Sequence, residues 1–456
     1  MMKKLLLGST ALIAGGLMPA PAMADDPIKM GIGGYWTGYV IAGSIDSIYA
    51  LDGSAVDFKG VNLIYEGEIH FIGQTKLDDG TTVGLTVELE AHNMNQTWTG
   101  SGNQTVSDVS AGTPVSRSKQ IDEAFLFAYG DWGRVEFGSR DPGTYRMFYG
   151  TPSALNGFGF GQHNFNWNAV GDSNKAVRAG YGYQIGAKWG DANRITYFTP
   201  RFDGLQVGVS YAPKLQQHLT AGDCGYNKGA NFANCPINDG QYQDEFDIGA
   251  NYLNKFGDIT VALHAGFANA SFNPGYRKYN NAANLISGWN RSTWRQHVFG
   301  AQLGYDGWTV GGAMGYDTNG LGANYYTGVD NDTRYWTIGA MYETGPWEMS
   351  AGWGSAVNNN GNGSASIGGF TSGTSVSNFA ATATSTSAYF GTNPNTGAAS
   401  FGAETTNKYE VGVAYQLETS VKLVGGFMYY QIGGPSNATN GNSWAFIMGI
   451  VVYWLP

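Results

Sequence analysis

The sequence predicts an all-β protein, namely a sixteen-stranded antiparallel β-barrel that crosses a membrane. Three observations predict this fold: strands with period-two alternation recur along the chain, short turns alternate with long polar connections, and the composition is unusual for a soluble protein. Of the 456 residues 69 are glycine and 13% are charged, whereas proteins average about 7% glycine and about 25% charged residues. Because 42% of the chain is still hydrophobic, the chain is not of the disordered class, which couples low hydrophobicity to high charge.

The first 24 residues predict a cleaved export signal. Lys3 and Lys4 precede an apolar stretch over 5–17, and a small-residue cleavage site ends at Ala24, before Asp25. An N-terminal membrane anchor is the alternative, but glycines and prolines interrupt the stretch, and later in the chain no run of about 18 apolar residues predicts a membrane helix. We therefore expect cleavage between Ala24 and Asp25 and a single barrel domain over 25–456.

Period-two alternation predicts strands whose two faces differ. In 82–90 valine and leucine alternate with glycine, threonine and glutamate, and 205–211, 308–317 and 409–416 show the same pattern. In a barrel with a watery lumen, the apolar face meets lipid and the polar or tiny residues face inward. We therefore expect apolar residues on the outside and polar residues on the inside, the reverse of a soluble protein.

Seven short turns and eight long connections alternate along the chain. The short turns are 78–80, 130–133, 200–204, 256–258, 305–307, 344–346 and 417–420. The long connections are approximately 46–57, 93–118, 141–190, 215–241, 271–292, 318–332, 358–404 and 432–442. Fifteen connections imply sixteen strands, and short turns at one end with long loops at the other are typical of a membrane barrel with periplasmic turns and outer loops.

Aromatic residues flank several of the short turns. They are Phe125, Phe127, Tyr129, Tyr305, Trp308, Tyr342 and Trp347. Such residues form belts where a barrel meets the lipid interface, although aromatic residues are also good strand formers in any sheet. We expect them to face the lipid interface.

Motifs of enzymatic chemistry are missing from the sequence. There is no phosphate-binding G-x-x-x-x-G-K-[ST], no G-x-S-x-G and no H-E-x-x-H, and the six histidines are not spaced like a metal-binding pair. Glu66 with Glu68, and Glu88 with Glu90, each share one face of a strand. Such pairs serve as acid and base in glycosidases, but in a barrel they are a charged strip in water. We expect no enzyme, no cofactor and no metal.

Charge and cysteine content further narrow the function. Removing residues 1–24 removes two lysines and no acidic residue, so the formal net charge changes from −10 to −12. Such an acidic chain has no electrostatic basis for binding nucleic acid. The two cysteines, Cys224 and Cys235, would meet an oxidising compartment, so we expect a disulfide. A metal pair is the alternative, but the other ligands are missing.

Four passages resemble the Gram-negative general porins, the sixteen-stranded trimeric type of proteobacteria. Residues 122–140 are similar to the family's strand-turn-strand that ends in Gly-Arg and leads into the third loop, and 193–211 resemble its Tyr-x-(Ser/Thr)-Pro-x-Phe-x-Gly hairpin. Residues 335–353 resemble a later hairpin with Gly-Pro-Trp at the turn, and 67–90 resemble the second hairpin. The likeness covers essentially all of the mature chain, as pattern rather than identity between these passages.

Two departures from the family pattern stand out. The terminal aromatic is Trp454, but Leu455 and Pro456 follow it. The Gly-Arg step is Gly138-Ser139-Arg140, so the arginine is displaced by one residue. A one-residue slip in a strand turns a side chain to the other face.

The resemblance implies a third loop, about 141–175, that folds into the lumen and narrows it, and it implies a homotrimer. In such porins acidic loop residues oppose basic wall residues. The basic candidates are Arg140, Arg194, Arg134 and Arg146, and the acidic candidates are Glu136, Asp141, Asp172, Glu66, Glu68, Glu88 and Glu90. The loop is rich in aromatic residues, namely Phe158, Phe160, Phe165 and Trp167. They either wedge the loop against the wall or form a stacking surface for sugars or aromatic solutes.

The leading interpretation is an outer-membrane porin for passive diffusion of small hydrophilic solutes and ions. Since rings of one charge attract counter-ions and the chain is acidic, it is expected to prefer cations weakly. The alternatives are a solute-selective barrel that uses the loop aromatics, an outer-membrane hydrolase on a barrel, and a secreted soluble β-sandwich or lectin. The expected partners are outer-membrane lipid, two further copies of the chain, and the solutes.

Overall fold

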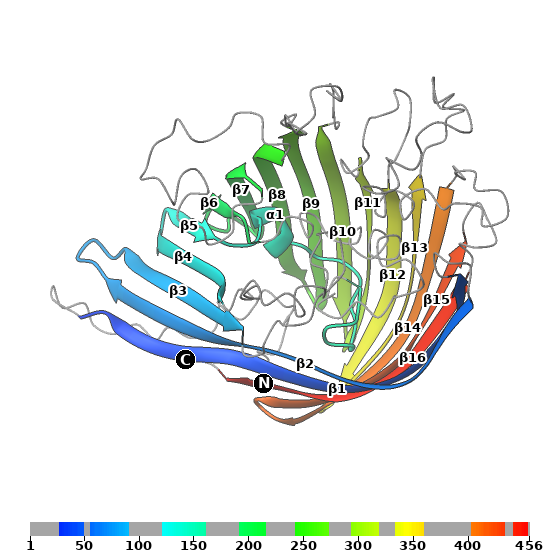
Figure 1. Ribbon diagram of the computed structural model, residues 1–456. Helices are drawn as coiled ribbons and strands as arrows, with labels where there is room; N and C mark the ends of the chain where they lie inside the picture. The colour runs from blue at the N-terminus through cyan, green and yellow to red at the C-terminus, as the bar shows by residue number, and fades with distance from the viewer. Residues whose placement is uncertain are drawn as a thin grey trace, which may run out of the picture.

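Sixteen strands form one closed antiparallel barrel, in which each strand pairs with its neighbours in sequence and β1 pairs with β16 (Figure 1). The structure is a computed structural model that describes residues 27–49, 55–90, 121–160, 191–215, 242–272, 293–318, 333–359, 403–433 and 441–454. The predicted signal with Ala24 and Asp25, the pair Cys224 and Cys235, and Asp172 lie outside these residues. The prediction of a sixteen-stranded antiparallel barrel is confirmed.

The strands follow one another around the barrel in chain order. They are β1 (Lys29–Tyr49), β2 (Ala55–Lys76), β3 (Thr82–Glu90), β4 (Ile121–Gly130), β5 (Gly133–Ser139), β6 (Asn193–Phe198), β7 (Leu205–Lys214), β8 (Tyr242–Phe256), β9 (Ile259–Phe272), β10 (Trp294–Tyr305), β11 (Trp308–Asp317), β12 (Thr333–Thr344), β13 (Trp347–Asn359), β14 (Ala403–Glu418), β15 (Val421–Gly433) and β16 (Gly441–Trp454).

The seven short turns connect pairs of strands as expected, from β2–β3 to β14–β15. The turn at Asp306-Gly307 shows the local cause, because both residues have positive φ, 47° and 79°, which a two-residue hairpin needs to match the twist of its strands. The predicted bounds of the first long connection were wrong. Strands β1 and β2 continue to Tyr49 and from Ala55, so the connection is shorter than the predicted 46–57.

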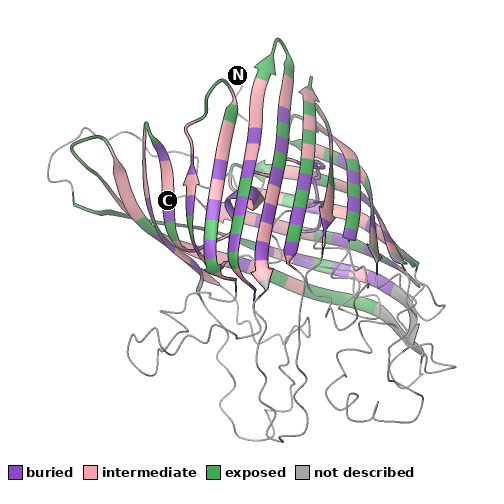
Figure 2. Ribbon diagram, turned by 90° about the horizontal axis from the view of Figure 1, so that it is seen from above, coloured by how far each residue is buried: buried purple, intermediate pink, exposed green. Residues whose placement is uncertain are grey.

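The two faces of the strands differ as the alternation predicts (Figure 2). Leu63, Leu126 and Phe137 are 73%, 57% and 64% exposed, whereas Glu88 and Glu136 on the inward register are buried. An apolar outer face is the reverse of a soluble protein and is what a lipid-facing wall requires.

The aromatic residues at the short turns divide into two groups. Trp308 and Trp347 lie on the exposed outer face, where they contact the rings of Tyr342 and Tyr415. The expectation was wrong for Phe125, Phe127 and Tyr129. Phe125 and Phe127 are buried inside the barrel, where arginines stack on them, and Tyr129 also lies beneath a guanidinium, 5.6 Å from its ring centroid.

The third loop folds into the barrel, as the resemblance implies (Figure 1). It begins after β5 with the short helix α1 (Gly143–Arg146), and no helix in the described parts of the chain is long and apolar enough to cross a membrane. Hydrogen bonds hold the loop to successive wall strands. They join Gly143 N to Ser210 Oγ (2.8 Å), Thr144 N to Asp247 Oδ1 (3.0 Å), Gln302 Nε2 to Gly150 O (2.7 Å), Thr151 Oγ1 to Thr337 Oγ1 (2.7 Å), Ala154 N to Ser350 Oγ (2.9 Å) and Tyr39 OH to Asn156 O (2.9 Å).

Part of the inner wall is apolar, which differs from the expected watery face. Leu155 and Phe158 of the loop pack with Tyr39, Ile41 and Met428 in one buried cluster on β1, β14, β15 and β16. Fully burying one such side chain contributes about 1.5–3 kcal/mol. The loop therefore covers apolar residues that would otherwise face the lumen, and in return the wall anchors the loop.

Glycine at position 300 allows the loop to approach the wall. A Cβ built there would lie 1.7 Å from the carbonyl oxygen of Tyr149. At Gly304, on the same face of β10, the nearest atom would be Thr260 Cβ at 3.4 Å, an ordinary van der Waals contact. Strand β10 can therefore touch the loop backbone only if residue 300 has no side chain.

We predict that Gly300→Ala displaces the loop and lowers the free energy of unfolding by about 1–3 kcal/mol, the usual cost of overpacking. The measurement is urea unfolding of the refolded protein, together with tryptic cleavage of the loop. Gly304→Ala is the control and changes stability by about 0.5 kcal/mol or less. Equal stability of the two variants would show that the loop is not seated on β10.

Candidate functional site

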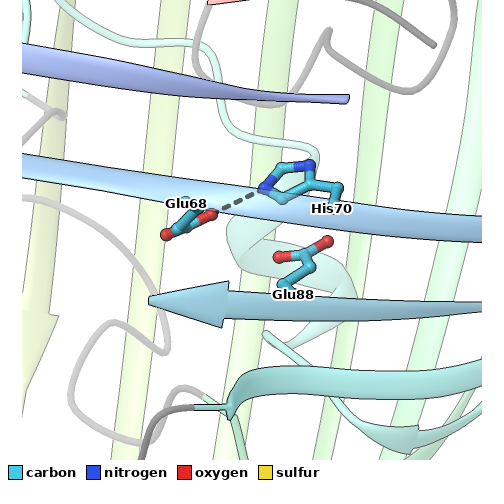
Figure 3. Close-up of side chains that lie close together, drawn as sticks. All are labelled: Glu68, His70 and Glu88. Atoms are coloured by element: carbon cyan, nitrogen blue, oxygen red, sulfur yellow. Dashed lines mark hydrogen bonds and ion pairs between the residues drawn. The ribbon is translucent and has the colours of Figure 1, made fainter. Parts of the chain in front are cut away.

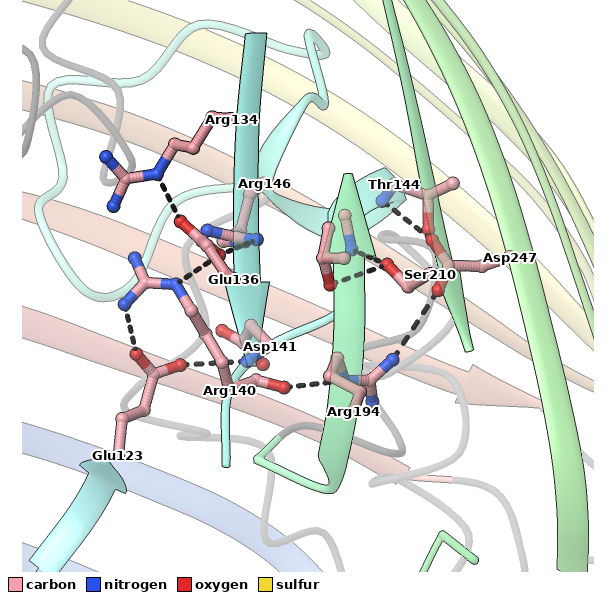
Figure 4. Close-up of polar contacts among 12 residues, drawn as sticks. Glu123, Arg134, Glu136, Arg140, Asp141, Thr144, Arg146, Arg194, Ser210 and Asp247 are labelled. Carbon is pink, nitrogen blue, oxygen red and sulfur yellow. Dashed lines mark hydrogen bonds and ion pairs between the residues drawn. The ribbon is translucent and has the colours of Figure 1, made fainter. Parts of the chain in front are cut away.

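Three of the predicted arginines converge on one glutamate at the start of the third loop (Figure 4). Glu136 Oε1 accepts from Arg134 Nε at 2.6 Å, and its Oε2 lies 3.3 Å from Arg140 Nε and 2.5 Å from Arg146 Nη2. Arg134 and Glu136 are two residues apart on β5 and share its inward face. Arg146 comes from α1, so the loop itself completes the cluster.

The insertion of Ser139 does not turn Arg140 outward. Arg140 is 6% exposed and lies four residues after Glu136, so it keeps the inward register of β5. Its Nη1 donates to Glu123 Oε2 at 2.9 Å and lies 3.7 Å from Glu88 Oε1. Its guanidinium also stacks on Phe125, 3.8 Å from the ring centroid. The displaced arginine therefore stays inside the barrel.

Arg194 belongs to a separate network that anchors the loop. Its Nε donates to the carbonyl oxygen of Arg140 at 2.7 Å, and its Nη1 lies 3.0 Å from Glu245 Oε2 and 3.5 Å from Asp247 Oδ2. Asp247 also accepts the Thr144 N–H, and Arg194 is only 3% exposed. The structure thus separates Arg194 from the other three arginines, and its charge is satisfied within the wall.

A β-bulge adds two acidic residues that the sequence reasoning missed. Val87 pairs with Ala124 and Leu89 with Ile121, so β4 carries one extra residue in this interval. Asp122 and Glu123 occupy it, and both reach the inner side: Glu123 bonds Arg140 and the Asp141 N–H, and Asp122 lies beside Glu68 and Glu90. A bulge re-aims side chains in this way, and strict alternation would send one of the two residues outward.

The acidic candidates on β2 and β3 line one side of the wall. Glu68 pairs directly with Glu90 across the two strands, and Glu88 lies on the same face. Together with Glu66, they form a carboxylate-rich strip next to the arginine cluster. The acids therefore lie on the wall beside the arginines; the described part of the loop, 141–160, contributes Asp141 alone.

Two loop carboxyls have raised pKa values. Burial is the main cause for Asp141, followed by repulsion from Glu123, and although Arg194, Arg146 and Arg140 oppose it, the pKa rises to about 7. Burial, and next the charge of Asp141, also raises the pKa of Asp191 well above its usual range. The carboxyl of Asp141 therefore changes its charge near neutral pH.

Two of the four loop aromatics serve as packing residues. Phe158 and Phe160 are 2% and 4% exposed. Lys408 on β14 donates to the carbonyl oxygen of Phe158, and its Nζ lies 4.5 Å from the centroid of Phe160. Both rings therefore wedge the loop against the wall. Phe165 and Trp167 lie outside the described residues.

Comparison with known families gives one match over nearly the whole chain. Residues 8–455 match the family described as Gram-negative porin. Two curated relatives, both uncharacterized proteins, come from Rickettsia conorii (24% identical over 191 residues, 37% of this chain and 43% of the relative) and Rickettsia typhi (23% over 192 residues, 37% and 44%). The chain thus spans less than half of the length of these relatives.

Solved structures share the fold. A loop L8 deletion mutant of OmpT, an outer membrane protein of Vibrio cholerae, has a TM-score of 0.50 at 11% identity, covering 93% of this chain and 99% of that chain. The outer membrane channel DcaP of Acinetobacter baumannii has a TM-score of 0.50 at 10% identity, covering 94% and 98%. At these identities the likeness establishes the fold alone.

We predict that Glu136→Gln lowers the free energy of unfolding by about 3–5 kcal/mol, since removing one partner of a buried ion pair leaves charge uncompensated. Here three guanidinium groups lose their shared anion. The measurement is urea unfolding, with limited proteolysis of the third loop.

The control for this variant is Glu348→Gln. It removes a single ion pair, Glu348 Oε1 to Lys422 Nζ at 2.8 Å, and the side chain of Glu348 is more exposed than that of Glu136, 21% against 3%, so the expected loss is about 1 kcal/mol or less. Similar losses in both variants would contradict a central role for Glu136.

Proposed function

This chain belongs to the Gram-negative porin family, and on that premise we propose that it forms a water-filled outer-membrane channel for passive diffusion of small hydrophilic solutes and ions. The observation that carries the proposal is the closed barrel with charged side chains on its inner wall and a loop folded among them. Closure leaves no unpaired backbone edge in lipid, and inward charges are compatible with water in the lumen.

A weak preference for cations follows from the charges near the loop. Carboxylates outnumber arginines on this side of the wall. The carboxylates are Glu66, Glu68, Glu88, Glu90, Asp122, Glu123, Glu136 and Asp141, and the arginines are Arg134, Arg140 and Arg146. Carboxylates that line a pore attract cations. This local excess on the wall therefore supports cation preference more directly than the net charge of the whole chain does.

Three further parts of the proposal come from the sequence analysis: two from the residues themselves and the third, the homotrimer, from the resemblance to the family. Export uses residues 1–24 as a signal that is cleaved before Asp25, which N-terminal sequencing of the mature protein tests. Cys224 and Cys235 form a disulfide, which mass spectrometry of the unreduced protein tests. Three copies assemble into a homotrimer through their apolar outer walls, which native mass measurement in detergent tests.

A solute-selective channel remains the alternative function, and it lacks a specific observation in its favour. Phe158 and Phe160 are buried in packing contacts, so a stacking surface would depend on Phe165 and Trp167. General diffusion is therefore the function that the described residues support best.

We predict stepwise conductance when the refolded protein is added to a planar bilayer, with a reversal potential in a KCl gradient that indicates preference for potassium over chloride. Heat-modifiable migration on a gel verifies folding first. Preference for chloride would overturn the selectivity, and a silent bilayer from folded protein would overturn the channel.

We predict that the preference for potassium falls as pH is lowered through about 7, because the carboxyl of Asp141 is ionised above its raised pKa and neutral below it. Asp141→Asn makes this step in the pH profile of the reversal potential smaller, by the part that the Asp141 carboxyl contributes.

The control for the pH experiment is Asp79→Asn, at a short turn. The Thr81 N–H donates to Asp79 Oδ1 at 2.9 Å, and this hydrogen bond lowers the pKa of Asp79, so its charge does not change near neutral pH. A profile that Asp141→Asn leaves unaltered would refute the role of Asp141.

A further inference from the structure

An imidazole lies beside two carboxylates on the inner wall where β2 meets β3 (Figure 3). Glu68 and His70 are two residues apart on β2 and face inward together, and His70 is the direct cross-strand partner of Glu88 on β3. One ligand atom from each of the three residues lies within 4.8 Å of the others. The side chains of His70 and Glu68 are 12% and 13% exposed, so an ion in the lumen can reach them.

Two members of this group are held in position by neighbours. His70 Nε2 lies 2.8 Å from Glu68 Oε2, and the hydroxyl of Tyr35 donates to Glu68 Oε1 at 2.9 Å. Tyr35 and His70 also make an edge-to-face ring contact at 6.4 Å. Hydrogen bonds from outer residues that orient a ligating side chain are a regular feature of metal sites.

The third member, Glu88, is a buried carboxylate without adequate compensation. It is 7% exposed, and its carboxylate accepts no hydrogen bond from any group that the structure describes. Its cationic neighbour is Arg140 Nη1 at 3.7 Å, which bonds Glu123 at the shorter distance of 2.9 Å. Burying a carboxylate is costly unless it is paired and hydrogen-bonded, so this position favours an additional cation.

We propose that Glu68, His70 and Glu88 bind one divalent transition-metal ion, with Zn²⁺ as the representative, on the wall of the channel. An imidazole nitrogen with two carboxylate oxygens suits Zn²⁺ and its neighbours in the first transition row, whereas Mg²⁺ and Ca²⁺ prefer oxygen ligands alone. Three protein ligands leave a coordination position for water on the lumen side. The ion compensates Glu88 and the facing charges of Glu68 and Glu90.

The sequence alone predicted no metal here, because the ligands come from two strands. The spacing of Glu68 and His70 is unremarkable, and Glu88 joins them only through the register of β2 and β3. Two other groups, Glu68 with Glu90 and Asp122, and Glu123 with Asp141 and Asp191, contain carboxylates only. The imidazole distinguishes the proposed site from them.

The test is calorimetric titration of ZnCl₂ into EDTA-stripped protein in detergent, with MgCl₂ as competitor. We expect one zinc ion per chain with an affinity that His70→Gln and Glu88→Gln each weaken by about tenfold or more. X-ray absorption at the zinc edge is expected to show a nitrogen ligand that His70→Gln removes. His297→Gln is the matched control, since His297 is exposed on the outer face of β10, and it leaves the affinity unchanged.

Several outcomes would overturn the proposal: equal zinc affinity in the wild type and His70→Gln, displacement of zinc by equimolar Mg²⁺, or an equal loss in His297→Gln. Heat-modifiable migration verifies that each variant is folded. If His70→Gln does not fold, Glu88→Gln takes its place in the affinity comparison. Binding in detergent requires no conductance, so a silent bilayer with intact zinc binding would refute the channel and leave the metal site standing.

Discussion

The structure depends on one constraint: in lipid, every backbone N–H and C=O of a spanning segment must be bonded within the protein. A sheet satisfies this only by closing on itself, and here β1 pairs with β16 along most of its length, from Gly34 with Trp454 to Ile45 with Ser443. Closure assigns one face of each strand to lipid and the other to the interior. Because successive side chains of a strand point to opposite faces, the residues at alternate positions must suit lipid on one face and the interior on the other.

The interior is therefore the place where charge and loop packing meet. Glu136 neutralises arginines from β5 and from α1, and Arg194 bonds the backbone where the loop begins. Further along, Leu155 and Phe158 enter an apolar part of the wall. Electrostatics positions the first residues of the loop and burial positions the later ones, so the loop and the barrel stabilise each other.

The same interior has an uneven charge distribution. Carboxylates gather where β2 and β3 meet the bulge of β4, because the bulge adds Asp122 and Glu123 to the acids of the neighbouring strands. Arginines reach only part of this strip, and Arg140 is shared among Glu88, Glu123 and Glu136. In the proposed channel an excess of carboxylates would attract cations, and the proposed metal site would use the same excess.

The sequence by itself determined the strand number, the short turns, the alternation of a lipid-facing with an inward face, and the shared strand faces of Glu66 with Glu68 and of Glu88 with Glu90. These follow from local patterns, since alternation and turn chemistry involve residues close in the chain. Only the tertiary structure decided that Phe125 and Phe127 lie inside the barrel beneath arginines and that Arg194 anchors the loop. It also decided that Asp122 and Glu123 both turn inward and that His70 faces Glu88. Each of these depends on cross-strand register, a bulge or loop packing, which join residues that are distant in sequence and leave no periodic signal in it.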